Sequence, residues 1–199
     1  NGGSTWITPL LQKAAYDAVL DFAPISLVSR EVNIVAVHPS LPVKSVSQLI
    51  VLSKARPGEL NYSLSTIGGV GHLAAELFNS MAGINIVGIP YKGTAAAVTA
   101  LISGEVQLTI ADAGLAAPHV KSGKLRALAV TSAEPTALAP GLPTVGASLS
   151  GYEAVSVTGI FAPARTPDAI IKRLNQEIVR VLNLPDVKER FFKNGAETV

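Results

Sequence analysis

The fold class is readable from residues 60–83, which run Leu60-Asn-Tyr-Ser-Leu-Ser-Thr-Ile-Gly-Gly-Val-Gly-His-Leu-Ala-Ala-Glu-Leu-Phe-Asn-Ser-Met-Ala-Gly83. Residues 60–64 are predicted to form a short strand, and residues 65–71 form a loop rich in glycine and hydroxyl side chains. The apolar residues that follow are spaced along one face of a helix, which a glycine ends: Leu73, Leu77, Phe78, Met81 and Gly83. This stretch is therefore one unit of strand, loop and helix.

The same unit recurs along the chain from about Val32 onward. Further strands are expected at residues 32–38, 84–89, 106–111, 125–131 and 153–162, and helices at about 46–56, 95–103, 113–121, 168–181 and 186–195. Ser45 and Gln48 have the spacing of a capping box, which marks a helix start. Strands that alternate with helices indicate an α/β fold built on a parallel sheet with right-handed crossovers.

Composition excludes several classes of protein. The chain has 199 residues, of which 48% are apolar and 15% charged, and its apolar runs are too short for the ~18 consecutive residues of a membrane span. A net charge of +2 without a Lys/Arg run gives no expectation of a nucleic-acid partner. The absence of cysteine removes thiol catalysis and disulfides. Residues 1–5 lack the basic start and apolar core of a secretory signal.

Motifs for catalysis or metal binding are not found. His38, His72 and His119 are far apart and have no acidic neighbour at ligand spacing, so no metal site and no cofactor are expected. No Gly-x-Ser-x-Gly elbow is present. Residues 69–74 match a dinucleotide fingerprint, but the following strand ends in Gly88-Ile-Pro-Tyr91 without the acidic residue that holds a ribose. The sequence therefore does not predict an enzyme.

The glycine-rich loop is better suited to binding an anion. Small residues at Gly69 and Gly71 let backbone amides at a helix start approach a carboxylate, and the hydroxyls of Ser65 and Thr66 add donors. A tight turn with an ordinary cap explains the same residues equally well. Gly93-Thr94 opens a second helix in the same way, and the two helix starts are expected to converge on one site, although an ordinary cap is again the alternative.

Three further residues are candidates for ligand contact near the carboxyl ends of strands. Asp112 ends a strand and opens a helix, so it can meet a ligand hydroxyl or ammonium or act as an N-cap. His72 is a ligand contact or a residue of the cap region. Tyr91 offers a ring wall and one hydroxyl, or packs on the domain surface.

Six ordered blocks carry a resemblance to a known family. They are Tyr16-Asp-Ala-Val-Leu-Asp-Phe-Ala-Pro-Ile-Ser-Leu-Val28, Pro39-Ser-Leu-Pro-Val-Lys-Ser45, Pro57-Gly-Glu-Leu-Asn-Tyr62, Pro90-Tyr-Lys-Gly-Thr94, Pro118-His-Val-Lys-Ser-Gly-Lys-Leu-Arg-Ala-Leu-Ala-Val-Thr131 and Leu142-Pro-Thr-Val145. The chain resembles the Bug receptors, the periplasmic solute-binding proteins of tripartite tricarboxylate transporters, over essentially its whole length.

The resemblance implies a periplasmic-binding-protein-like fold of type II, in which two α/β lobes close around a small carboxylate and deliver it to the membrane components of the transporter. Residues 32–131 would form the second lobe, residues 1–31 and 151–199 the first lobe, and residues 132–150 a connecting segment. By position, Ser65–His72, Tyr91–Thr94 and Asp112 would face the ligand from the second lobe. Ser4 and Thr5 would approach it from the first lobe.

The chain departs from the family pattern in two ways, and the first of them leads to an alternative function. Family members usually begin with a further strand, loop and helix before the position of Asn1 and continue past Val199 with a closing helix, so the first lobe is expected to be incomplete. The family also usually has a polar or aromatic residue where this chain has Ala113. The alternative is a shortened chain without an intact ligand site, which forms a dimer through the uncovered sheet edge and apolar surface of its first lobe.

Overall fold

The longest strand, β1 (Phe22–Val37), serves two compact units of the chain. The computed structural model describes residues 6–11 and 13–199. The first unit comprises Asn1–Glu31 and Ser156–Val199, and the second comprises Val32–Val155. The last six residues of β1 are all buried, whereas most of the preceding residues are partly or fully exposed. β1 begins at Phe22, ten residues before the strand expected from the sequence, which started at Val32. The expectation missed the first half of β1, because only the second half has the continuous apolar character of a strand buried on both faces.

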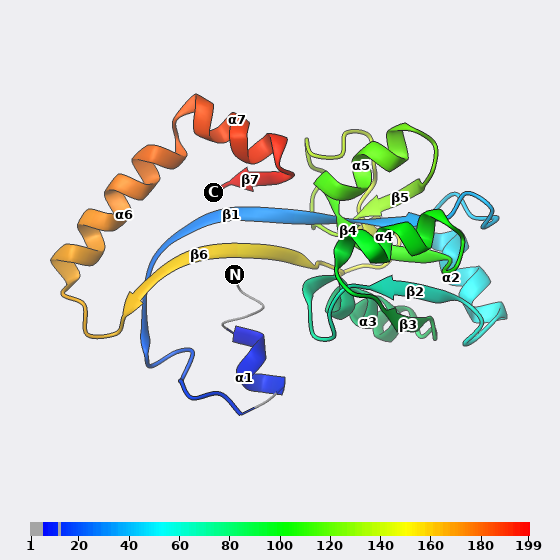
Figure 1. Ribbon diagram of the computed structural model, residues 1–199, viewed down its shortest axis with the longest axis horizontal. Helices are drawn as coiled ribbons and strands as arrows, with labels where there is room; N and C mark the ends of the chain where they lie inside the picture. Colours follow the sequence, from blue (N-terminus) through cyan, green and yellow to red (C-terminus); the bar gives the residue numbers. More distant parts are fainter. Residues whose placement is uncertain (1–5, 12) are drawn as a thin grey trace. The chain divides into compact units, whose positions relative to one another are not determined.

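The second unit contains five helices, one of them a short 3-10 turn, around its sheet strands (Figure 1). They follow β1 in the order α2 (Val46–Ala55), β2 (Asn61–Leu64), α3 (Val70–Ala82), β3 (Val87–Pro90), α4 (Thr94–Ile102), β4 (Leu108–Asp112), α5 (Ala113–Lys121), β5 (Arg126–Val130) and the 3-10 turn η2 (Val145–Ala147). The expected N-cap of α2 is formed, since Ser45 Oγ accepts from the Gln48 amide at 3.2 Å, but the return bond of a capping box goes to the residue before the cap. Gln48 Oε1 in turn accepts from the Lys44 amide at 2.7 Å.

The sheet of the second unit has the order β3-β2-β4-β1-β5. β2 pairs in parallel with both β3 and β4, but β1 runs antiparallel to β4 and β5. The prediction of a wholly parallel sheet is therefore wrong at β1. The connection through α2 brings the chain back to the same end of the sheet at which β1 finished. The amides of His38, after β1, and of Asn61, at the start of β2, both donate to Gln107. Alternation of strand and helix in a sequence does not reveal such a return.

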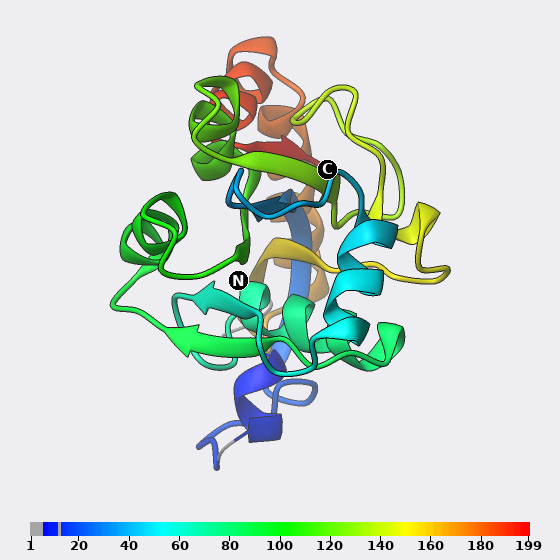
Figure 2. The ribbon, with the colours of Figure 1, turned by 90° about the vertical axis from the view of Figure 1, so that its right-hand side faces the viewer.

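Two apolar cores lie on opposite faces of this sheet, because alternate residues of β1 point to opposite sides. Val35 and Val37 join a core with residues of α2 and α3, including the fully buried Leu49 and Phe78. Ile34 and Ala36 join a core with residues of α4 and α5. Figure 2 shows α2 and α3 on one side of the sheet and α4 and α5 on the other. The second unit is therefore a three-layer α/β sandwich.

Residues 132–150, the expected connecting segment, lie within the second unit. Thr144 forms a bridge with Val130 at the end of β5, and Val145 is fully buried in the core beneath α2 and α3. The chain then returns to Tyr152, whose hydroxyl donates to the carbonyl oxygen of Ala74 at 2.9 Å. Burial raises the pKa of the Tyr152 phenol. Most of the segment lies on the surface, and Thr144 and Val145 attach it to the sheet sandwich.

The first unit is built on the first half of β1. The elements of this unit besides β1 are α1 (Thr8–Leu11), β6 (Val155–Pro163), α6 (Asp168–Leu182), α7 (Pro185–Lys193) and β7 (Ala196–Thr198). β6 and β7 both pair with β1, and β7 is antiparallel to it with Ser29 opposite Thr198. α6 is strongly amphipathic in sequence, yet only Leu182 of this helix is buried. Among the residues that the structure describes, no helix is long and apolar enough to cross a membrane.

Candidate functional site

Three helices of the second unit begin where neighbouring parallel strands end. β2 leads into α3, β3 into α4 and β4 into α5, and the strands are neighbours in the order β3-β2-β4. α3 covers one face of the sheet, whereas α4 and α5 cover the other. In open α/β sheets, ligands bind at the carboxyl ends of strands where successive helices leave to opposite faces. This edge of the sheet carries the predicted site residues of the second unit.

The first turn of α3 has no side-chain cap. Gly69 is its N-cap residue, with φ −72° and ψ 165°, and among the described residues no side chain caps the helix. The loop before it is tight, because the Gly69 amide donates to the Thr66 carbonyl oxygen at 3.0 Å. Ser65 is half-buried and Thr66 is exposed. Amides at such a helix start carry partial positive charge and need an acceptor.

The first turn of α4 is also without a side-chain cap. Its N-cap residue, Gly93, has φ 94° and ψ 165°, a conformation open only to glycine. The Gly93 amide donates to the Tyr91 carbonyl oxygen at 2.9 Å, which turns the chain sharply into the helix. Thr94 follows and is exposed. Two helix starts from adjacent parallel strands therefore present amides to an acceptor.

α5 differs, because Asp112 caps it. Asp112 Oδ1 accepts from the Gly114 amide at 2.8 Å, and the side chain is the N-cap of the helix. This geometry supports the N-cap interpretation of Asp112. Its role as a ligand contact stays a prediction.

Gly71 and His72 lie in the first turn of α3 and contact protein atoms. A β-carbon at Gly71 would lie 2.5 Å from the carbonyl oxygen of Ile110, so this glycine lets α3 approach β4. His72 Nδ1 accepts from the amide of Gly68 at 3.0 Å. Gly68, with φ 79°, lies in the range Ser65–His72 that was expected to face the ligand, but no role of its own was predicted for it; its position four residues before His72 allows this contact.

Tyr91 packs inward. Its ring lies against the core beneath α4 and α5, and its hydroxyl oxygen is buried without a hydrogen-bond partner among the described residues. Burial, and after it the nearby Glu105 carboxylate, raises the pKa of Tyr91. Tyr91 thus packs against the core and not only on the domain surface, and its ring as a ligand contact stays a prediction. Ser4 and Thr5, the candidates from the first lobe, lie outside the described residues.

The side chains that a metal centre or a dinucleotide site needs are not found among the described residues. In the described part of the chain, no group of three or more His, Asp or Glu side chains could hold a metal ion. β3 ends in Ile89 and Pro90, so the acidic residue of a dinucleotide site is absent there too.

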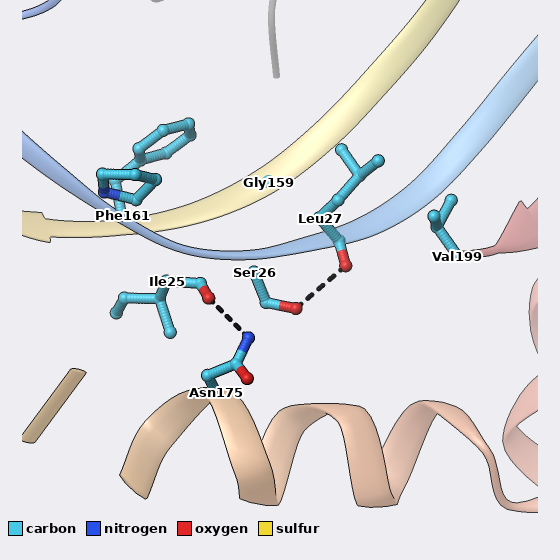
Figure 3. Close-up of a pocket in the computed structure, with 8 residues that line it drawn as sticks. Ile25, Ser26, Leu27, Gly159, Phe161, Asn175 and Val199 are labelled. Atoms are coloured by element: carbon cyan, nitrogen blue, oxygen red, sulfur yellow. Dashed lines mark hydrogen bonds between the residues drawn. The ribbon is translucent and has the colours of Figure 1, made fainter. Parts of the chain in front are cut away.

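The first unit contains an apolar groove of about 580 Å³ (Figure 3). It is lined by Pro24, Ile25, Ser26, Leu27, Gly159, Phe161, Asn175 and Val199. Asn175 of α6 donates to the carbonyl oxygen of Ile25 at 2.7 Å, which ties α6 to β1 beside the groove. Another groove in the second unit, lined by α2 residues such as Val51 and Leu52, is also apolar. Neither groove contains a predicted site residue.

Comparison with known proteins gives consistent matches. The family model described as "Tripartite tricarboxylate transporter family receptor" matches residues 3–199. The chain is 35% identical to Protein BugT of Bordetella pertussis over 96% of its own length and 59% of that protein. It is 37% identical to Rpa4515 of R. palustris, solved with adipate, with a TM-score of 0.80 over 94% of this chain and 63% of that one.

A third similar protein is the periplasmic binding protein BugD. It has a TM-score of 0.81 and 30% identity, over 100% of this chain and 66% of BugD. The periplasmic-binding-protein-like α/β fold expected from the sequence is thereby confirmed. The chain spans less than two thirds of each of these three proteins.

Proposed function

Since this chain belongs to the tripartite tricarboxylate transporter receptor family, we propose that it is a receptor that binds a small carboxylate and leaves it chemically unchanged. The family model covers residues 3–199, and the similar protein Rpa4515 was solved with adipate, a dicarboxylate. The proposal for this chain is a mono- or dicarboxylate held at the carboxyl ends of β2, β3 and β4.

The observation that carries the proposal is the pair of uncapped helix starts. Gly69 and Gly93 open α3 and α4 without a side-chain cap, and the strands before them are parallel neighbours with Leu64 opposite Pro90. Helix N-termini of this kind bind carboxylates through backbone amides and the helix dipole, without arginine. The same arrangement suits many carboxylates, since few side chains would read the rest of the ligand.

Each residue of the site has a proposed role. The amides that follow Gly69, at Val70–His72, and the one that follows Gly93, at Thr94, would donate to carboxylate oxygens, and the hydroxyls of Ser65, Thr66 and Thr94 would add donors. Asp112, already the cap of α5, would meet a ligand hydroxyl or ammonium. Ser4 and Thr5 are proposed contacts from the first lobe. Tyr91 would contribute ring surface only, because its hydroxyl is buried.

The proposed setting is the periplasm, with the membrane components of a tripartite tricarboxylate-type transporter as partners. Family membership and the likeness to the periplasmic protein BugD support both statements. No nucleic-acid partner and no cofactor are proposed. The dinucleotide alternative finds no support at the end of β3, and Gly71 already packs against Ile110.

Isothermal titration calorimetry of the 199-residue chain tests the proposal. Adipate, succinate and acetate are titrated at low salt, and adipamide, which has the same length but no charge, is the control. We expect at least one carboxylate to bind and adipamide not to bind. Equal binding of adipate and adipamide, or no heat from any carboxylate, would count against a carboxylate receptor.

The alternative function, an oligomerising module, is favoured by one observation in the first unit. α6 leaves Ile170 49% and Leu174 41% exposed, and the apolar groove beside it is open. Exposed apolar surface of this kind is typical of an interaction site. Light scattering at several concentrations tests this alternative, and a monomer throughout would exclude it.

A further inference from the structure

His72 turns its ring back onto the loop that precedes its own helix. It is the third residue of α3, and its Nδ1 lies 3.0 Å from the amide nitrogen of Gly68. A backbone amide can only donate, so Nδ1 must be the acceptor and carry no proton. The ring proton of neutral His72 therefore sits on Nε2.

This bond acts on the glycine-rich loop together with two other contacts among the described residues. The Gly69 amide donates to the Thr66 carbonyl oxygen at 3.0 Å, and Gly71 abuts the carbonyl oxygen of Ile110. Both of those contacts involve backbone atoms alone. The His72 bond comes from a side chain and holds Gly68, whose φ of 79° sets the direction in which the chain enters α3.

Gly68 has no β-carbon and populates many backbone conformations when it is not held. Its amide would otherwise compete with the amides of the first turn of α3 for an incoming acceptor. With Gly68 bonded to His72, the amides at the start of α3 are the ones that remain for a ligand. A preorganised loop also avoids the ordering entropy that binding would otherwise require.

We propose that the His72 side chain has a positioning role: it holds Gly68 through Nδ1 and so keeps the α3 amides aligned on the carboxylate, without the ring itself touching the ligand. This inference rests on the proposed function of the same edge of the sheet. It also assigns to His72 a different role from the ligand contact expected from the sequence.

Two substitutions separate the ring nitrogens. His72→Asn places an amide oxygen on Cγ, where Nδ1 is attached, so it can still accept from Gly68. His72→Gln extends the oxygen by one atom, to the position of Nε2. We expect His72→Asn to bind adipate within about threefold of the unaltered chain and His72→Gln to lose about tenfold, the effect of one hydrogen bond.

The reverse order would mean that Nε2 contacts the ligand and would overturn the inference. Equal losses in both variants, or no loss in either, would overturn it as well. Both variants are first compared by urea denaturation, so that a global loss of stability is recognised.

A second measurement needs no ligand and distinguishes failure of this inference from failure of the proposed function. Nitrogen-15 NMR of the neutral ring should report the Nε2–H tautomer of His72. The Gly68 amide should be protected from hydrogen exchange in the unaltered chain and in His72→Asn but not in His72→Gln. An Nδ1–H tautomer, or an unprotected Gly68 in the unaltered chain, would refute the positioning role even if carboxylates bind.

Discussion

Gly71 and Ile110 meet backbone to backbone, since a β-carbon on Gly71 would lie 2.5 Å from the Ile110 carbonyl oxygen. This contact seats the first turn of α3 directly on β4. The position of the α3 amides is therefore fixed by the sheet as well as by the loop.

Gly71→Ala should displace the start of α3. We expect the free energy of unfolding to fall by about 1–3 kcal/mol, the range for overpacking, because neither backbone can yield without moving an element. Adipate affinity should fall as well. Urea denaturation and calorimetry measure the two effects. Gly69→Ala is the control for stability, because the φ of Gly69 is an ordinary −72° and its added β-carbon would lie 3.1 Å from the nearest atom, the Thr66 carbonyl oxygen, instead of 2.5 Å. A fall in the free energy of unfolding as large as that of Gly71→Ala would contradict the packing argument.

Gly93→Ala should weaken carboxylate binding through backbone strain. The φ of 94° and ψ of 165° cost an alanine about 1–3 kcal/mol, and the chain will relax by turning the α4 amides away. Gly123→Ala is the matched control, because Gly123 also has a positive φ, 73°, and open space around it. Gly123 lies after the C-terminus of α5, away from the helix starts that form the candidate site. Both variants should lose stability, and only Gly93→Ala should lose affinity. Equal losses of affinity would point to a global effect.

Tyr152 should make the protein less stable at alkaline pH. Burial raises the pKa of its phenol above the usual value of 10.0, so the folded state keeps a proton that the unfolded state releases. The free energy of unfolding therefore falls as the pH rises above about 10. Tyr152→Phe should lose about 1 kcal/mol at pH 7, for the bond to Ala74, and show a shallower decline above pH 10. A decline as steep as in the unaltered chain would contradict this assignment.

Leu174→Gln tests the exposed face of α6. If two chains associate through the apolar surface of the first unit, this change should shift the population to monomer in light scattering, because Leu174 lies in the middle of the apolar stripe. Val51→Gln, at a residue of α2 that is 69% exposed, removes a similar side chain from the second unit. Dissociation caused by Val51→Gln, or none caused by Leu174→Gln, would exclude association through α6.

Local sequence signals predicted the helices well. Ser45 and Gln48 form the expected cap of α2, and α5 spans Ala113–Lys121 as expected. These elements are set by neighbouring residues, through side-chain caps and apolar spacing. The short strand β7 and the direction of β1 were missed, because both depend on pairing with residues far away in the sequence.

The candidate site was predictable at the level of the loops but not of side-chain roles. The glycine pattern located the starts of α3 and α4, which have no side-chain cap, as is also the case for α6 and α7. It could not tell that Gly71 faces Ile110, or that the Tyr91 ring turns into the core, because those contacts join separate elements. The His72 to Gly68 bond spans four residues, yet a histidine in a first helical turn has many other orientations.

The pairing of Ser29 with Thr198 has a consequence for biogenesis. The second unit is one continuous segment, Val32–Val155, and can collapse on the ribosome as soon as that segment has emerged. The first unit needs residues on both sides of that segment, so the pairing of Ser29 with Thr198 must wait through the synthesis of more than a hundred residues. During that interval the backbone groups of β1 that later pair with β7 are open to other chains and to holdase chaperones, and slow translation after Ser156 would prolong the exposure.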